Sequence, residues 1–300
     1  MFYLHIQLDI QRRRVDSQMT SIVSVVKGER GLKPVYRALD YIQYQPVLEP
    51  YDTVLVKVNL ITDHTYETGI TTDPIVVEAV INRVHELDKK AIVVETEGGI
   101  TSPDTAIHET GIMDVVERTG AEYLNMGKLE DKVELTVENP KAIDKFKVAR
   151  IATENAIITV PTMKLLHHTV ITMGLKNMFG MLTIRSKYSL HKHGMDNVIY
   201  DIVRTLPPHL CVIDGFYGKE GKGPWQGNPV KMDTIIASLD TVAADATAAR
   251  CIGIDPEIVD HVRWLHEAGI GEMNDIEVVG DGINAVYHEW DRDLDAKLTF

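Results

Sequence analysis

Short apolar, β-branched runs alternate along the chain with longer stretches in which apolar residues recur every three or four positions. The first pattern predicts buried strands and the second predicts amphipathic helices. Their alternation is typical of parallel strands joined by crossover helices. The predicted strands are Ser21–Val26, Thr53–Val58, Ala91–Glu95, Ala156–Val160, Leu210–Asp214, Thr234–Ser238 and Ile276–Val279.

Helix starts and stops are readable between these strands. Asp73-Pro74 places a capping carboxylate before a proline, which predicts a helix from Asp73 to about Asp88. Ser102-Pro103 repeats this signal, and a helix over Thr105–Gly120 is expected to end at its glycine. Further helices are predicted at Val170–Met181, Met195–Arg204, Thr241–Ile252 and Pro256–Glu267.

The segment Lys132–Lys147 alternates charged and apolar residues around Asn139-Pro140, which predicts a solvent-facing hairpin. The whole pattern predicts an α/β fold with a mixed, mostly parallel sheet and helices on both faces. Two lobes are expected, over residues 19–160 and 161–300, with the candidate site loops in the second. Residues 1–18 form either an extension that precedes a natural start at Met19 or a genuine edge strand or oligomer arm.

The charge and composition of the chain argue against several classes of function. The 300 residues carry a formal charge of -13, which disfavours nucleic acids and anionic membranes as partners. No apolar run approaches the roughly 18 residues of a membrane helix, and the chain start lacks a secretory signal. Only two cysteines occur, so an intrinsic iron–sulfur cluster is not expected and a cytoplasmic location is predicted.

Ligands of open α/β sheets bind beyond the carboxyl ends of the strands, so the residues that follow each strand are candidates. Lys57 stands inside an apolar strand that leads to Asn59, and a buried lysine needs a partner. An edge strand with a solvated lysine is an equal alternative. The double glycine in Glu95–Pro103 matches no phosphate-binding motif, and a plain tight turn is favoured there.

The densest cluster follows the strand Ala156–Val160. Lys164, His167, His168, Lys176 and Asn177 fall within fourteen positions there, and their types suit anion capture, proton transfer or metal ligation. Further on, Lys187–His193 places His191 and His193 on one side of an extended segment. That arrangement indicates a divalent metal site completed by a carboxylate, a basic lid over an anion, or a solvated loop.

The segment Asp214–Pro229 is the most specific local signal. Five glycines and two prolines after a strong strand indicate a long binding loop, with Asp214 at the end of the strand. Glu220 and Lys222 are candidates for an acid–base pair or an ion pair, and Trp225 offers a packing face.

Together these segments resemble the DUF362 family of uncharacterised archaeal and bacterial proteins, which are often labelled iron–sulfur-associated. The resemblance covers roughly residues 53–255 and is strongest at Lys176–Gly180 and Glu220–Trp225. Members of that family with clusters carry an added ferredoxin-like module with repeated cysteines. This chain has no such module, so the iron–sulfur label is not carried over.

The preferred hypothesis is a cytoplasmic isomerase, lyase or hydrolase that acts on a small anionic metabolite by acid–base chemistry. The alternative is a non-catalytic ligand- or metal-binding accessory protein of a redox system. A homo-oligomer or a redox protein partner fits either hypothesis, and a divalent metal is the candidate cofactor. The assigned residues are, for catalysis, His167, His168, Lys164 and Glu220; for substrate binding, Lys57, Asn59, Lys176, Asn177, Lys187, Lys222 and Trp225; and for metal, His191, His193 and Asp214.

Overall fold

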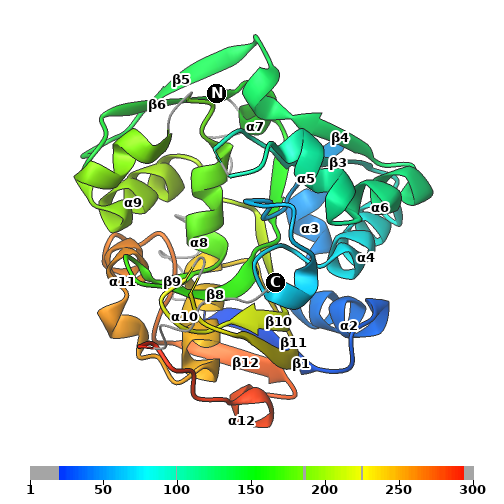
Figure 1. The fold of residues 1–300 in the computed structure, drawn as a ribbon, viewed down its shortest axis with the longest axis vertical. Helices are drawn as coiled ribbons and strands as arrows, with labels where there is room; N and C mark the ends of the chain where they lie inside the picture. Colours follow the sequence, from blue (N-terminus) through cyan, green and yellow to red (C-terminus); the bar gives the residue numbers. More distant parts are fainter. Residues whose placement is uncertain (1–19, 99, 185–186, 224–225, 294–300) are drawn as a thin grey trace.

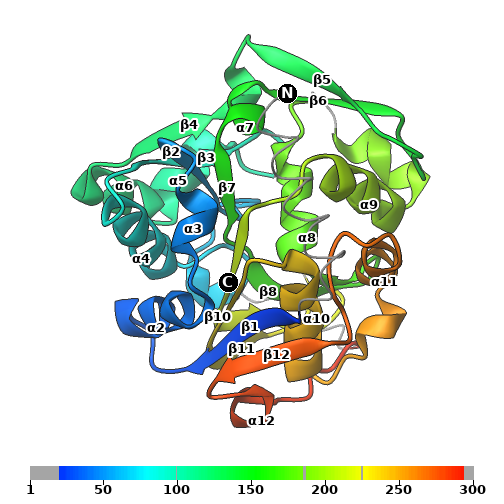
Figure 2. The same ribbon diagram turned by 180° about the vertical axis from the view of Figure 1, so that it is seen from behind.

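The computed structural model describes residues 20–98, 100–184, 187–223 and 226–293. A ten-stranded sheet runs through the molecule, with helices on both of its faces (Figures 1 and 2). Eight strands lie in the order β12 (Ile276–Gly280), β1 (Ser21–Lys27), β11 (Pro229–Ser238), β10 (Leu210–Lys219), β7 (Ala156–Thr159), β2 (Thr53–Lys57), β3 (Lys90–Glu95) and β4 (Glu122–Asn125). All of them run in the same direction except β11, which is antiparallel to both neighbours.

Alternate side chains of each strand enter separate cores on the two faces of the sheet. Val54 and Val56 of β2 belong to one core, whereas Leu55 belongs to the other. The first core is covered by α2 (Leu32–Ile42), α3 (Gln45–Leu48), α4 (Pro74–His85), α5 (Pro103–Glu109) and α6 (Ile112–Thr119). The second is covered by α7 (Ile151–Glu154), α8 (Gly174–Asn177), α9 (Met195–Thr205), α10 (Thr241–Cys251), α11 (Asp260–Glu267) and α12 (Ile283–Val286). The predicted fold class is confirmed.

Most predicted elements are present near their expected bounds. The side chain of Asp73 accepts a hydrogen bond from the backbone N–H of Ile75 at 2.9 Å, which is the expected cap of α4. The predicted hairpin consists of β5 (Lys132–Thr136) and β6 (Lys145–Ala149), an antiparallel pair outside the main sheet. The extension predicted for residues 1–18 lies outside the described residues.

Three predicted helices are wrong in part. The helix over Thr105–Gly120 is divided at Gly111, whose φ of 79° ends α5 and begins α6. Residues 170–181 form β9 (Val170–Thr172), α8 and the 3-10 helix η3 (Met178–Met181), because Val170–Thr172 pairs with a strand that the sequence did not reveal. Residues 256–267 comprise the 3-10 helix η5 (Pro256–Ile258) and then α11, separated by the extended Val259.

The prediction that a strand ends at Asp214 is also wrong. β10 continues to Lys219 across an irregularity between Gly215 and Tyr217, because β11 pairs with it along its whole length. Its first residues pair with β7, and Asp214 and Lys219 pair with β8 (Thr162–Leu166). β2 and β3, in contrast, end at Lys57 and Glu95. On the β10 side the sheet therefore extends beyond the carboxyl end of β7, whereas on the β2 side it does not.

Among the described residues, none of the helices combines the length and the apolar composition that crossing a membrane requires.

Candidate functional site

A cavity of about 420 Å³ lies at the carboxyl ends of β2 and β3, beside β8, β9 and α8. This is where parallel α/β sheets bind ligands. Its wall includes five lysines, two histidines and one glutamate, together with amides and hydroxyls. These polar residues are Lys57, Asn59, Glu95, Thr96, Thr162, Lys164, His168, Thr172, Lys176, Asn177, Lys187, His191 and Lys219.

A buried ion pair forms the floor of this cavity. The Nζ of Lys57 lies 2.9 Å from the Oε2 of Glu95, and their side chains are 1% and 6% exposed. Lys57 also donates to the carbonyl of Val58 at 2.6 Å and to the Oδ1 of Asn177 at 3.3 Å. Gly180 packs against the pair so closely that a Cβ there would lie 2.5 Å from the Lys57 Nζ. The Lys57 ammonium is therefore fully coordinated by protein oxygens.

Lys164 on β8 is the second fixed lysine. Its side chain, 5% exposed, donates to the Oδ1 of Asn59 and, at 2.8 Å, to the carbonyl of Ile70. Burial, followed by the positive charges of Lys176, Lys219 and Lys57, lowers the pKa of Lys164 to about 7. This ammonium is thus suited to exchange a proton near neutral pH.

Lys187 and Lys219 are also buried and hydrogen-bonded. Lys187, at the start of the 3-10 helix η4 (Lys187–His193), donates to the Oγ1 of Thr96 and to the carbonyl of Gly180 at 3.2 Å. Lys219, at the end of β10, donates to the carbonyl of Gln226 at 2.6 Å. Burial lowers the pKa of each lysine to about 8.

Lys176, on α8, differs from the other four lysines. The residue is half-buried, and its ammonium has no hydrogen-bond or ion-pair partner within the part of the chain that the structure describes. The Phe179 ring centre lies 5.9 Å from its Nζ. Burial, then the charge of Lys57, lowers the pKa of Lys176 to about 8, while Asp196 opposes this shift.

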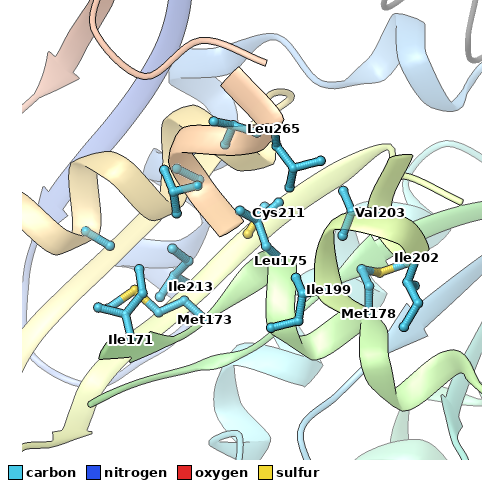
Figure 3. Packing of buried hydrophobic residues seen from close by; sticks show 14 of the residues in the cluster. Ile171, Met173, Leu175, Met178, Ile199, Ile202, Val203, Cys211, Ile213 and Leu265 are labelled. Atoms are coloured by element: carbon cyan, nitrogen blue, oxygen red, sulfur yellow. The ribbon is translucent and has the colours of Figure 1, made fainter. Parts of the chain in front are cut away.

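Hydrogen bonds and apolar packing hold the short helix α8 in place. Both oxygens of the Asp245 carboxylate accept backbone N–H groups at its start, from Gly174 at 2.8 Å and from Leu175 at 3.0 Å. Leu175 packs into a layer of apolar side chains that includes Ile199 and Cys211 (Figure 3). On the opposite side, the Asn177 amide donates to the carbonyl of Lys57 at 3.0 Å. These contacts fix where Lys176 is presented.

The five lysines outnumber the carboxylates of this wall. Glu95 is the one carboxylate among the described lining residues, and it is already paired with Lys57. The family model described as "Domain of unknown function (DUF362)" matches residues 54–250, a range that contains all five lysines and Glu95. The chain belongs to the DUF362 family. The resemblance found in the sequence is confirmed.

This DUF362 member is also similar to the "Thylakoid-associated protein sll1697" of Synechocystis sp.. The two are 26% identical over 236 residues, which cover 74% of this chain and 70% of the relative.

The structure brings eight of the predicted site residues to the cavity wall. Lys57 lies on a central strand with a buried partner, so the edge-strand alternative is wrong. His168 and His191 are exposed and line the mouth of the cavity, where His191 stacks on Tyr188 at 5.5 Å between ring centres. The other lining residues that were predicted are Asn59, Lys164, Lys176, Asn177 and Lys187.

The remaining predicted residues that the structure describes lie outside this wall. His167 is exposed and contacts the ring of His168. The Oε2 of Glu220 accepts the backbone N–H of Asp291 at 3.0 Å, and the carbonyl of Lys222 accepts the backbone N–H of His167 at 3.2 Å. Trp225 lies outside the described residues.

The structure does not assemble the predicted metal ligands. Residues Lys187–His193 form a 3-10 helix instead of an extended segment, so positions two apart no longer share a side. Asp214, 1% exposed, accepts the backbone N–H groups of Asp73 at 2.8 Å and Phe216 at 3.1 Å. No group of three or more His, Cys, Asp or Glu residues suited to a metal occurs within the described ranges.

Five polar lining residues were not assigned from the sequence: Glu95, Thr96, Thr162, Thr172 and Lys219. Glu95 and Thr96 precede the double glycine for which a plain turn was favoured. Lys57 could have pointed to Glu95, because a lysine at the end of an apolar strand requires a partner elsewhere in the chain. Lys219 was missed because the strand was expected to end at Asp214, whereas β10 continues to Lys219.

Proposed function

We propose that this protein is an enzyme that binds a small organic anion in the lysine-lined cavity and acts on it by acid–base chemistry. The observation that carries this proposal is the excess of ammonium groups: five lysines face one cavity whose described wall contains a single carboxylate. A desolvated excess of positive charge is stabilised by a negatively charged ligand.

Lys164 is the proposed proton donor and acceptor. Its pKa of about 7 allows both protonation states near neutral pH, and its bonds to Asn59 and to the carbonyl of Ile70 fix the position of its Nζ. The histidines take a secondary place in this proposal. His168 contacts the outer end of the ligand at the cavity mouth, whereas His167 has no part in catalysis.

A cytoplasmic location is part of the same proposal. It is supported by the two cysteines, Cys211 and Cys251, which are buried and unpaired. The Synechocystis relative is named for its association with thylakoids. Fractionation of the native cells, with a marker for each compartment, tests the location directly.

The first experiment measures anion binding with Lys164→Met and a matched control, Lys192→Met, which changes an exposed lysine outside the cavity wall. Phosphate, pyrophosphate, pyruvate and citrate are titrated by calorimetry and thermal shift. We expect at least one anion to raise the melting temperature, with affinity at least 10-fold lower in Lys164→Met and unchanged in Lys192→Met. Failure of all four anions to bind, or equal affinity in both variants, would contradict the proposal.

Turnover of the anion that binds then separates an enzyme from an accessory protein. We expect product formation by the wild-type chain and its loss in Lys164→Met. Stabilisation by the anion without any product would favour the accessory role.

A further inference from the structure

The five lysines of the cavity are not equivalent. Lys57, Lys164, Lys187 and Lys219 each donate to at least one fixed protein oxygen. Such bonds stabilise the ammonium form and restrict the directions from which the nitrogen can approach a substrate. Lys176 makes no such bond to any described residue, so its amine is available to react.

The surroundings of Lys176 disfavour its protonated form. Positive charges face it from three elements: Lys57 on β2, Lys164 on β8, and Lys187 on η4. The negative charge of Asp196 on α9 opposes them, but that carboxylate is bound to His261 at 2.6 Å. The titratable His191, also on η4, faces Lys176 as well. Desolvation of a lysine beside another cation is a recognised way to activate an amine nucleophile.

We infer that Lys176 is a nucleophile that forms an imine with the carbonyl group of the substrate, and that this substrate is a small aldehyde or ketone bearing a carboxylate or phosphate. The inference rests on the proposed function, since the anionic group of the substrate must bind among the other lysines. It gives the site a reaction class, covalent catalysis through a lysine imine, and a substrate class.

The step balances without any added oxidant or reductant. The neutral Lys176 amine adds to the carbonyl carbon, forming a C–N bond while the C=O π pair moves to oxygen. One amine proton moves to that oxygen. The Lys164 ammonium donates a second proton, water departs, and the nitrogen lone pair completes a protonated imine. The positive charge of Lys164 is thereby transferred to the imine nitrogen.

The test traps this imine in the full chain. The protein is incubated with pyruvate, with dihydroxyacetone phosphate or with acetone, each with cyanoborohydride, and the products are analysed by intact mass and peptide mapping. We expect one adduct per chain on Lys176 with an anionic carbonyl compound and at least 10-fold less with acetone. The arm that reacts faster identifies carboxylate or phosphate as the anionic group.

Three variants complete the experiment. Lys176→Arg and Lys176→Met are expected to lose the adduct while keeping the circular dichroism spectrum of the wild type, and Lys192→Arg is expected to keep full labelling. An adduct that persists in Lys176→Arg, or that spreads over several lysines, would overturn the inference.

Anion titration in the same samples separates the two proposals. Anion binding without an adduct on Lys176 would overturn the imine and leave the proposed function standing. Absence of both anion binding and adduct would overturn both proposals.

Discussion

At the scale of single residues, the pair of Lys57 and Glu95 illustrates how the fold tolerates buried charge. An isolated ion in such an interior costs several kcal/mol, and the attraction of an opposite charge offsets that cost only with good geometry and further hydrogen bonds. Lys57 has both, with Asn177 and a backbone carbonyl as additional acceptors. Removing one partner therefore leaves an uncompensated charge.

Glu95→Gln is predicted to destabilise the protein by about 3 kcal/mol at neutral pH, because it leaves the Lys57 ammonium without its counter-ion. Urea unfolding followed by circular dichroism measures this loss. The control is the double variant Lys57→Met/Glu95→Leu, which removes both charges and is expected to recover most of it. A loss below about 1 kcal/mol in Glu95→Gln would show that the pair is not ionised.

The sequence predicted part of this arrangement. A lysine within an apolar strand required a partner, but Glu95 could not be identified because it lies on the adjacent strand, 38 positions away. Which strands are neighbours follows from tertiary packing, which spacing along the chain does not encode. His167 and His168 were predicted as site residues from their residue types alone. The structure places His167 outside the cavity wall.

At the scale of secondary structure, α8 is too short to form through its own helix propensity. Isolated helices below about 12 residues are marginal in water. The four residues Gly174–Asn177 are instead held by the Asp245 carboxylate and by apolar packing (Figure 3). The stability of this helix and the position of Lys176 are therefore linked.

Asp245→Asn is predicted to cost about 2 kcal/mol of stability and to weaken anion binding about 10-fold, because an amide can accept only one of the two N–H groups without placing its own NH₂ against the other. Urea unfolding and phosphate titration measure the two effects. Asp255→Asn is the matched control, since Asp255 caps the short helix η5 through the backbone N–H of Glu257. Equal losses of affinity in both variants would refute the link between Asp245 and the cavity.

Periodicity predicted the long helices and failed around residue 170. The apolar residues of Val170–Met181 recur at helical spacing, but the extended pairing of Lys164 with Thr172 and of Leu166 with Val170 takes precedence. That pairing depends on β8, a short strand directly after β7 whose polar residues suit a loop as well as a strand. Local pattern could not distinguish the two.

At the scale of the whole molecule, buried ionisable groups make stability depend on pH. Burial lowers the pKa of Lys164 to about 7 and those of Lys176, Lys187 and Lys219 to about 8. From these values up to the ordinary lysine pKa of roughly 10.5, the unfolded chain binds more protons than the folded one, so stability rises with pH. Burial and the charge of Asp73 raise the pKa of Asp214 to about 8, so stability falls as the pH rises towards that value.

We therefore predict a minimum in the free energy of unfolding near pH 8, with a rise towards pH 10. Urea unfolding at half-unit pH intervals measures this profile. Lys176→Met, which removes one of the shifted amines, is expected to reduce the rise between pH 8 and pH 10. A free energy that declines steadily over that interval would contradict the lowered pKa values of the four lysines.

The placement of the five lysines inside a chain with a net charge of -13 has a kinetic consequence. An approaching anion meets repulsion at long range and attraction only within the cavity. Repulsion beyond about 10 Å is screened at roughly 0.1 M salt, whereas charges inside the cavity are screened much less. Moderate ionic strength should thus speed the entry of the anion while its escape changes little, the reverse of the usual electrostatic steering.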